Sequence, residues 1–254
     1  MTKIIAISNQ KGGVGKTTTA VNLSSCLAVL EKKILLIDLD PQANATSSLG
    51  VENDIIENGI YQLFEKSSSA SDCINETTIV NLDIIPSHID LVGIEIESID
   101  LIDREYILMN AINKIEKEYD YIIIDCPPSL GLLTINALTA SNSVIIPIQC
   151  EYFALEGLGK LLNTIKSIQK IHNKNLSIEG LLLTMYDSRL KLSNQIIKEV
   201  KLHFNEMVFK TIIHRNVKLG EAPSYGESIL DYDVSSTGAN NYLNLARELI
   251  LNNS

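Results

Sequence analysis

A glycine-rich stretch near the N-terminus, SNQKGGVGKTT from Ser8 to Thr18, contains the residue types that hold a triphosphate. Glycines let backbone N–H groups turn inward around anionic oxygens, and Lys16 and Thr17 add a positive charge and a hydroxyl that can bind a metal ion. The usual phosphate-loop pattern, G-x-x-x-x-G-K-[ST], requires glycine where this chain has Gln10. The loop also carries an extra lysine, Lys11, which the usual pattern does not explain.

The segments on either side of this loop support a phosphate site. The loop follows an apolar, β-branched run, Lys3–Ile7, and precedes Thr17–Leu30, where apolar residues recur at helical spacing. Strand, glycine loop and helix is the order that a phosphate-binding unit requires. The alternative is an ordinary glycine-rich turn, which Lys16 and Thr17 argue against. The predicted nucleotide-binding residues of the loop are Gly12, Gly13, Val14, Gly15, Lys16, Thr17 and Thr18.

Three aspartates follow predicted buried strands. Lys33–Ile37 is a continuous apolar run that leads to Asp38 and Asp40, and Tyr121–Ile124 leads to Asp125. Ligands in parallel α/β sheets bind at the carboxyl ends of the strands. The sequence therefore predicts that these carboxylates handle a metal ion and water beside the phosphate loop. Taken alone, Asp40 before a proline would indicate only a turn.

Alternating strand and helix patterns predict an α/β fold, a doubly wound, mainly parallel sheet with helices on both faces. A chain of 254 residues that is 45% hydrophobic can bury one sizeable core, so we expect a single domain over 1–254. An apolar run at Val208–Ile213 precedes a polar segment. Further strands are predicted at Leu82–Ile85, Ser143–Ile148 and Ile178–Met185, and helices at Ile60–Phe64, Asp103–Tyr119, Ala137–Ser141, Leu155–Ile171 and Thr237–Leu251.

Composition predicts a cytoplasmic protein with no membrane association. The chain has no run of eighteen apolar residues, and its N-terminus enters a strand almost at once rather than a signal peptide. The cysteines form no C-x-x-C pair, which argues against a zinc or local redox motif and indicates free thiols. These cysteines are Cys26, Cys73, Cys126 and Cys150.

Positive charge is concentrated in one part of a chain whose net charge is −10. Between Lys160 and Lys218 there are eleven Lys or Arg and four Asp or Glu, a balance of +7, so the remainder carries −17. This segment could bind nucleic acid or could be a set of solvated helix faces, and charge alone does not decide between them.

Six motifs together resemble one family. KGGVGKTT, DLDPQANATSSLG, IIIDCPPSLG, PIQCEYFALEGL, TMYDSR and RNVKLGEAPSYG are similar to those of the ParA/Soj-type ATPases, which segregate bacterial chromosomes and plasmids. The likeness runs from Lys3 to about Leu249. The last four motifs separate this branch from other proteins that have an altered phosphate loop.

The resemblance implies an ATPase that uses ATP and Mg²⁺. Lys16 would bind the phosphates, and Lys11 would reach the nucleotide of a partner subunit, in the manner of an arginine finger supplied in trans. Asp40 would orient the attacking water, which makes Lys11, Lys16 and Asp40 the catalytic residues. The implied magnesium shell consists of Thr17, Asp38 and Asp125.

The resemblance also implies partners. An ATP-bound homodimer would bind double-stranded DNA without reading its sequence, through Arg189, Arg215 and Lys218, and would then be associated with the nucleoid. A ParB/Spo0J-type centromere-binding protein would stimulate hydrolysis and release the DNA. The residues proposed to contact the adenine ring are Met185, Arg215 and Asn216.

Two departures from the family pattern stand out. Ala43 replaces a frequent glycine, and His214 stands where proline often precedes the Arg-Asn pair; we interpret His214 as a surface histidine.

Three other functions can be compared with this one. A MinD-like membrane-associated ATPase would end in a basic amphipathic helix, whereas the tail after Arg247 has no basic face. A relative of the nitrogenase iron protein would need a second cysteine at the right spacing from Cys126. A passive ATP-binding module would have no use for Asp40.

Overall fold

The computed structural model describes residues 2–52, 56–151 and 154–253. It contains a seven-stranded sheet with the order β3-β4-β2-β5-β1-β6-β7. All neighbouring strands run parallel except β3 and β4, which are antiparallel. The strands are β1 Lys3–Ile7, β2 Ile34–Asp38, β3 Asn75–Glu76, β4 Leu82–Ile85, β5 Tyr121–Asp125, β6 Ser143–Gln149 and β7 Ser177–Thr184.

Alternate residues of the central strands enter two separate cores, one on each face of the sheet. In β2, Ile34 and Leu36 pack into one core, while Leu35 and Ile37 pack into the other. Strands covered on both faces need apolar residues at every position, which explains the continuous apolar runs of the sequence.

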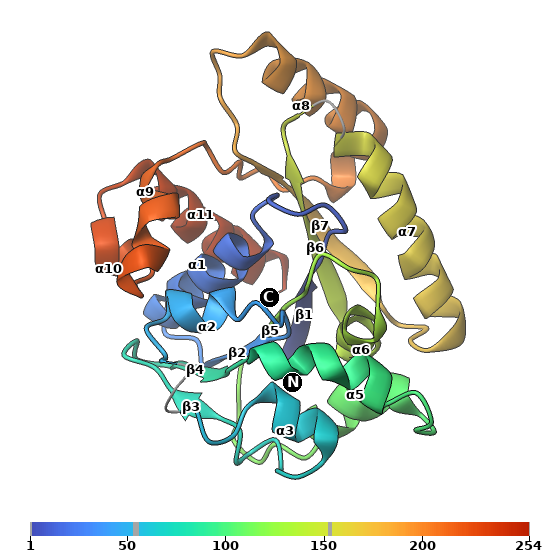
Figure 1. Ribbon diagram of the computed structural model, residues 1–254. Coiled ribbons are helices and arrows are strands. Elements are labelled where there is room, and N and C mark those ends of the chain that lie inside the picture. The colour runs from blue at the N-terminus through green and yellow to red at the C-terminus, as the bar shows by residue number, and fades with distance from the viewer. Residues whose placement is uncertain (1, 53–55, 152–153, 254) are drawn as a thin grey trace.

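Helices cover both faces, as predicted (Figure 1). The first core contains residues of α1 Lys16–Val29, α2 Asn44–Ser48, α9 Lys218–Glu221, α10 Ile229–Asp233 and α11 Thr237–Asn252. The second contains residues of α3 Ile60–Glu65, α4 Ile94–Glu97, α5 Ile107–Ile112, α6 Leu132–Ala140, α7 Ala154–Ile171 and α8 Lys191–Phe204. Short 3₁₀ turns are η2 Ile89–Gly93, η3 Arg104–Tyr106, η4 Asn205–Met207 and η5 Ala222–Tyr225.

Several predicted boundaries were wrong. The helix expected over Asp103–Tyr119 is only η3 and α5. Asp103 has a left-handed backbone, and four of the five residues at 114–118 are charged, so that Ile115 alone of that run packs against the core. The helix expected at Ala137–Ser141 begins earlier, at Leu132, where the Glu95 carboxylate accepts the first free backbone N–H. Helices α2, α4, α8, α9 and α10 were not predicted.

The apolar run Val208–Ile213 lies beside β7 without forming a continuous strand. Phe209 N–H donates to the Leu181 carbonyl at 3.1 Å and Ile213 N–H to the Leu183 carbonyl at 2.9 Å. The Phe209 ring lies against Gly180, where a β carbon would come within 2.4 Å of it. This segment therefore packs against β7 mainly through its side chains, and it does not form a full ladder of backbone hydrogen bonds.

Candidate nucleotide-binding site

The glycine-rich loop connects β1 to α1 and has the backbone shape that a phosphate cradle requires. Gly13 and Gly15 have φ of 72° and 88°, a left-handed region that favours glycine. At Gly12 and Gly13 a β carbon would meet nothing within 4 Å, so the inner side of the loop is open. The Thr184 hydroxyl donates to the Val14 carbonyl at 2.9 Å and ties the loop to the end of β7.

The N-terminus of α1 faces this loop without a capping side chain. The first backbone N–H groups of a helix have no partner inside the helix, and the helix dipole adds partial positive charge there. The 14-residue α1 therefore offers donors to an anion at the position where the loop would hold phosphate.

Lys16, the first residue of α1, is buried against the same loop. Its ammonium donates to the Lys11 carbonyl at 3.3 Å, and the residue is only 7% exposed. Burial lowers the pKa of Lys16, while the nearby Asp125, Cys126 and Asp40 act in the opposite direction. A buried cation with a single carbonyl partner can still accept anionic oxygens.

The carboxyl ends of β2 and β5 bring two aspartates together. Asp38 and Asp125 are direct partners in the β2–β5 ladder, and Asp125 is also paired with Ile7, the last residue of β1. Both carboxylates are completely buried. Parallel pairing thus places residues from three distant parts of the chain at one edge, as the sequence predicted.

Asp38 is held by hydrogen bonds. Its Oδ2 accepts from the backbone N–H and the hydroxyl of Thr46, at 2.8 and 2.7 Å, and its Oδ1 accepts from Asp40 N–H at 3.1 Å. Burial raises the pKa of Asp38 to about 6, although these hydrogen bonds oppose the shift. Sequence reasoning missed Thr46, whose position in the DLDPQANATSSLG motif could have indicated it.

Asp125 lacks such support, because neither of its buried carboxylate oxygens has a hydrogen-bond partner. Burial and the charge of Asp38 raise the pKa of Asp125 well above its ordinary value. Thr17 and Lys16 lower this pKa, and the Thr17 hydroxyl lies close to the carboxylate without completing a well-formed hydrogen bond. A buried carboxylate without partners is a site that fits a cation.

Asp40 lies just beyond β2 and is also buried, at 7% exposure. Its Oδ1 accepts from Gln42 N–H at 3.0 Å, and its carbonyl accepts from Ala43 N–H at 2.9 Å. Ala43 closes this turn with φ of 52°, in the left-handed region that favours glycine.

Lys11 makes a partly exposed ion pair with an acidic side chain of the same chain. Its ammonium lies 3.6 Å from the Glu151 carboxylate, and both side chains are partly exposed. Asn9 holds the backbone beneath it, because the Asn9 carboxamide accepts from Lys11 N–H at 3.0 Å and donates to the Pro147 carbonyl at 2.7 Å. The Lys11 ammonium is thus placed at the rim of the site rather than inside it. Tyr152 and Phe153 of the neighbouring motif lie outside the described residues.

A cavity of about 240 Å³ opens beside the loop, and the three residues proposed to contact the adenine ring line it together. They are Met185, Arg215 and Asn216. Sequence reasoning missed other lining residues, including Thr184, Leu219 and Tyr242. These apolar and polar side chains come from β7, α9 and α11, so no single motif could have identified them.

The interpretation of His214 as a surface histidine was wrong, because it is partly buried and lines this cavity. Its backbone N–H donates to the Asn241 carboxamide at 2.9 Å, and its ring lies at a steep angle to Tyr186 with centroids 5.2 Å apart. Through these contacts His214 helps to shape the wall of this cavity.

The predicted DNA-binding cations are exposed and paired with acidic neighbours. Arg189 donates to both oxygens of Asp187, at 2.9 and 2.6 Å, and thereby lowers the pKa of Asp187 to about 2. The charge of Arg215 also lowers it, so the two arginines lie near one carboxylate. Lys218 lies 3.7 Å from Glu221 and over the Tyr232 ring.

The four cysteines are free and buried. Among the described residues, no group of three or more His, Cys, Asp or Glu side chains is arranged to hold a metal ion. Within the same ranges, no helix has both the length and the apolar character to cross a bilayer.

Comparison with known proteins places this geometry among relatives. An AAA domain family model matches residues 2–178. The sporulation initiation inhibitor protein Soj of Bacillus subtilis is 57% identical over 252 residues, 99% of this chain and 100% of the relative. The chromosome partitioning protein ParA of Myxococcus xanthus is 49% identical over 98% of this chain and 88% of its own length.

One solved structure is similar over nearly the whole fold. It is a crystal structure of cobyrinic acid a,c-diamide synthase from Mycobacterium smegmatis with a bound ATP analogue and magnesium. Its TM-score is 0.86 at 36% sequence identity, and the match covers 98% of this chain and 95% of that one.

Proposed function

This chain belongs to the family of the chromosome-partitioning proteins ParA and Soj, and from that premise we propose that it is a partition ATPase whose site is the edge formed by β1, β2 and β5. The observation that carries the proposal is the buried Asp125 carboxylate, which has no hydrogen-bond partner and lies near Lys16 at the end of β5. A carboxylate in that state destabilises the fold unless a ligand compensates for it.

The phosphates of ATP would bind at the open inner side of the loop. Backbone N–H groups of Gly12 to Gly15 and of the first turn of α1 would donate to phosphate oxygens, and the Lys16 ammonium would supply positive charge. The adenine ring would occupy the cavity lined by Met185 and Asn216. Because the cavity adjoins Gly15 and Thr18, one ligand can span both sites.

Thr17, Asp38 and Asp125 would hold Mg²⁺, for which oxygen ligands are preferred. When bound, the ion would neutralise charge on the phosphates and on the paired aspartates. The unpaired oxygens of Asp125 fit this role most directly. Asp38 is already held by Thr46 and Asp40, and therefore suits a position in the outer shell.

Asp40 would orient the water that attacks the terminal phosphate. The backbone N–H groups of Gln42 and Ala43 hold the turn that carries Asp40, which is 7% exposed, and the charge of Asp40 acts on Lys16 and Asp125. A carboxylate positioned in this way can accept the proton of the attacking water, which is the reason to expect turnover rather than passive binding.

Lys11 would complete the site of a second subunit. Its ammonium is at the rim and makes only a partly exposed ion pair with Glu151, an interaction that costs little to break. In an ATP-bound homodimer, Lys11 would leave Glu151 and approach the phosphates held by the other chain. Its positive charge would then stabilise charge that develops during phosphoryl transfer.

The dimer would hold double-stranded DNA through phosphate contacts from Arg189, Arg215 and Lys218. These side chains are exposed, and they belong to the segment that carries +7. Joining two such surfaces in one dimer raises their effective concentration for one DNA molecule. A ParB/Spo0J-type partner would accelerate hydrolysis, which would separate the subunits and release the DNA.

The deciding experiment measures binding to DNA with ATP, with ADP and without nucleotide, each in the presence and absence of anionic lipid vesicles. We expect binding only with ATP, and none to vesicles. Lys16→Ala should weaken ATP binding at least tenfold, since a charged hydrogen bond is lost, whereas the exposed control Lys33→Ala should bind ATP normally. Binding to vesicles would favour the MinD-like alternative, and ATP binding without turnover would favour a passive module.

A further inference from the structure

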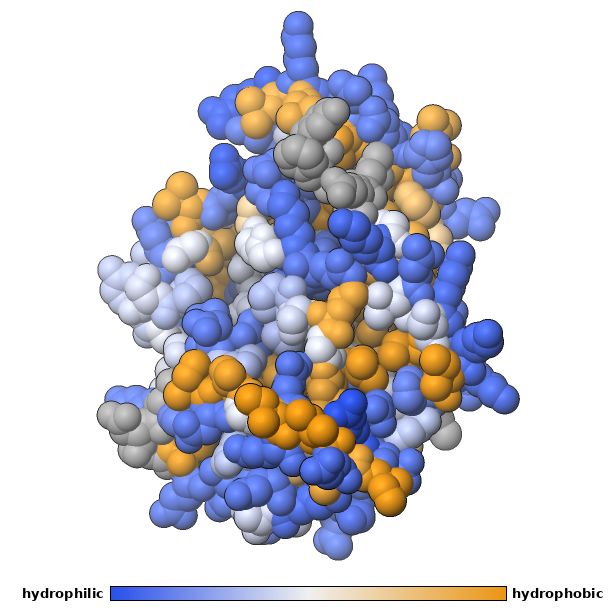
Figure 2. All heavy atoms as spheres, turned by 45° about the vertical axis from the view of Figure 1, so that its right-hand side comes forward, coloured by the Kyte–Doolittle hydropathy of each residue, from blue (hydrophilic) through white to orange (hydrophobic). Residues whose placement is uncertain are grey.

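The cavity beside the glycine-rich loop has walls that suit a planar base. Two of its lining side chains, Ile213 and Leu219, are buried and apolar. On the face of the molecule that Figure 2 shows, by contrast, hydrophilic side chains cover most of the surface. A base in this cavity would leave water, and a buried polar group without a partner costs free energy. The few polar groups on the cavity wall therefore decide which base fits.

The stretch 213–215 forms part of the cavity wall, and its backbone N–H groups are all engaged. Ile213 N–H and Arg215 N–H each donate to a backbone carbonyl of the neighbouring segment 183–186, at 2.9 Å in both cases. His214 N–H donates to the Asn241 carboxamide, also at 2.9 Å. This stretch can therefore offer hydrogen-bond acceptors to a base but no backbone donor.

The contact with Asn241 also determines which nitrogen of the His214 ring carries a proton. A backbone N–H can only donate, so the Asn241 atom that it meets is the carboxamide oxygen, Oδ1. The same oxygen lies 3.2 Å from Nδ1 of the His214 ring. Because an amide oxygen can only accept, Nδ1 is protonated, and Nε2 of the neutral ring is an acceptor. Within the described residues, Nε2 has no hydrogen-bond partner of its own.

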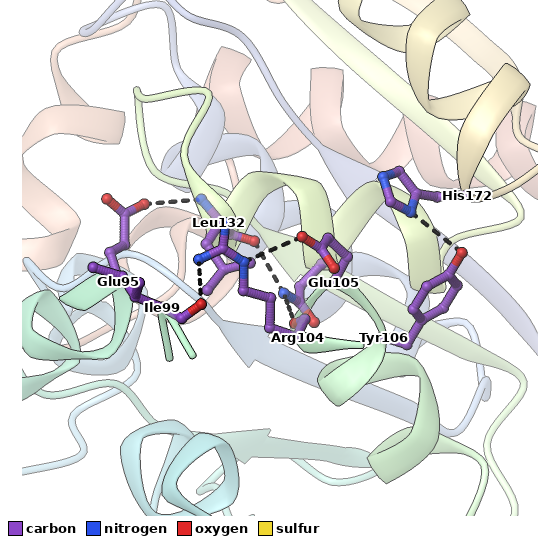
Figure 3. Close-up of polar contacts among 8 residues, drawn as sticks. Glu95, Ile99, Arg104, Glu105, Tyr106, Leu132 and His172 are labelled. Atoms are coloured by element: carbon purple, nitrogen blue, oxygen red, sulfur yellow. Dashed lines mark hydrogen bonds and ion pairs between the residues drawn. The ribbon is translucent and has the colours of Figure 1, made fainter. Parts of the chain in front are cut away.

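A second histidine, His172, lacks this constraint. Its Nδ1 lies 3.2 Å from the Tyr106 hydroxyl, which can donate or accept, so the contact does not fix the tautomer (Figure 3). The two histidines are otherwise alike, because each is partly buried and each ring lies at a steep angle to a tyrosine ring, 64° for His172 and 63° for His214. His172 directly follows α7 and lies outside the described lining of the cavity. It is therefore a matched control for His214.

We propose that His214 selects the base of the nucleotide, because its Nε2 accepts a hydrogen bond from the 6-amino group of adenine. Guanine and hypoxanthine have a carbonyl oxygen at position 6, so with these bases two acceptors would face each other. Asn241 is a positioning residue, which holds the ring and fixes its tautomer. The inference rests on the proposed function for the presence of a nucleotide. It goes beyond that function by naming what distinguishes ATP from other nucleoside triphosphates.

The test is competition against a fluorescent ATP analogue labelled on the ribose, with Mg²⁺ present, by three nucleotides that differ around position 6 of the base. These are ATP, purine riboside triphosphate, which has only hydrogen at position 6, and inosine triphosphate, which has a carbonyl there. The wild type should bind purine riboside triphosphate about fivefold and inosine triphosphate about twentyfold more weakly than ATP, because the first loses a hydrogen bond and the second leaves two acceptors opposed. A wild type that binds all three equally would overturn the proposal.

His214→Phe retains an aromatic ring and removes both nitrogens. It should reduce the preference for ATP over inosine triphosphate to about twofold, while the affinity for purine riboside triphosphate stays within about twofold of the wild type. The control His172→Phe makes the same replacement away from the cavity and should keep the wild-type preference. A His214→Phe protein that prefers ATP as strongly as the wild type would overturn the proposal, and so would an equal loss of preference in His172→Phe.

Asn241→Leu removes the acceptor that fixes the tautomer. It should lower the preference for ATP over inosine triphosphate to about fivefold, because Nε2 is then an acceptor for only part of the time. Equal weakening of all three nucleotides would mean that Asn241 acts only on the shape of the cavity, which contradicts its positioning role. If the wild type binds none of the three nucleotides, the proposed function itself fails, whereas tight binding without preference contradicts only the role of His214.

Discussion

Charged groups are buried in one region of the molecule and exposed in another. The first region is the sheet edge formed by β1, β2 and β5, and the second is the set of cations from Arg189 to Lys218. At the edge, Asp38, Asp125 and Lys16 are buried and held by the ends of strands and by the first turn of α1. Arg189 and Lys218, by contrast, are exposed and rest on acidic neighbours, Asp187 and Glu221.

This difference shows two ways of using charge. Ionising a buried group costs free energy, so a buried charged group favours one geometry and one ligand. Chemistry on a phosphate requires such fixed positions. Exposed pairs contribute little to stability and can exchange partners, as contact with any DNA phosphate requires. Variants at the edge should therefore change chemistry and stability, whereas variants of the exposed cations should change only binding and its dependence on salt.

The largest effect should follow Asp40→Ala. Losing the carboxylate that we propose orients the attacking water should reduce ATP turnover by about 10³-fold, within the range of general-base removal. ATP-induced dimers should then persist on DNA, which phosphate release and DNA dissociation after ATP addition can measure. Rapid dissociation from DNA would contradict this role. The control Asp72→Ala removes an exposed carboxylate and should leave turnover unchanged.

Lys11→Ala should preserve ATP binding and weaken ATP-dependent dimerisation by about 100-fold, because a buried charge contact between subunits would be lost. Light scattering with and without ATP measures the dimer, and a fluorescent ATP analogue measures nucleotide binding. If the Lys11→Ala protein still dimerises with ATP, the proposal that Lys11 contacts the nucleotide of the other subunit is wrong. Glu151→Ala tests the resting ion pair and should leave dimerisation intact or stronger.

Arg189→Glu combined with Lys218→Glu should weaken DNA binding at least tenfold while the ATP-dependent dimer still forms. Wild-type affinity should fall steeply as salt rises, and the slope of log affinity against log salt should decrease by about one for each lost phosphate contact. DNA binding that does not change with salt would contradict the claim that these exposed cations contact DNA phosphates. Lys33→Glu provides a control at the amino end of β2.

The smallest effect concerns stability without ligand. The unfolded chain ionises Asp38 near pH 4, but the folded protein holds that proton until about pH 6. Stability should therefore fall as pH rises from about 4 to 6, because the folded state binds more protons over this range. Saturating Mg²⁺ and ATP should reduce the decline. Thermal unfolding across this range measures it.

Asp125→Asn also tests how buried carboxylates affect the stability of the protein without ligand. Removing a buried charge that has no partner should stabilise the ligand-free protein at pH 7 by about 1–2 kcal/mol, while weakening magnesium-dependent ATP binding. A variant that is less stable than the wild type without ligand would mean that the Asp125 charge is compensated in the free protein.

The parts of the fold that the sequence predicted well are those in which local pattern and burial agree. The runs at 34–37 and 121–124 are apolar at every position because both faces of β2 and β5 are covered, and the loop before α1 requires its glycines for backbone reasons. The start of α6 and the early end of α5 were not predictable in this way. They depend on Glu95 and on packing from segments distant in the chain.

The sequence by itself determined the chemical inventory: a phosphate loop with an additional lysine at position 11, aspartates at strand ends, and a basic segment. Residue types and short spacings suffice for these, since each depends on neighbours within a few positions. Only the tertiary structure decided that Asp38 is held by Thr46 while Asp125 has no partner, and that His214 lines the cavity. Burial and partnership depend on contacts between distant segments, which local sequence does not encode.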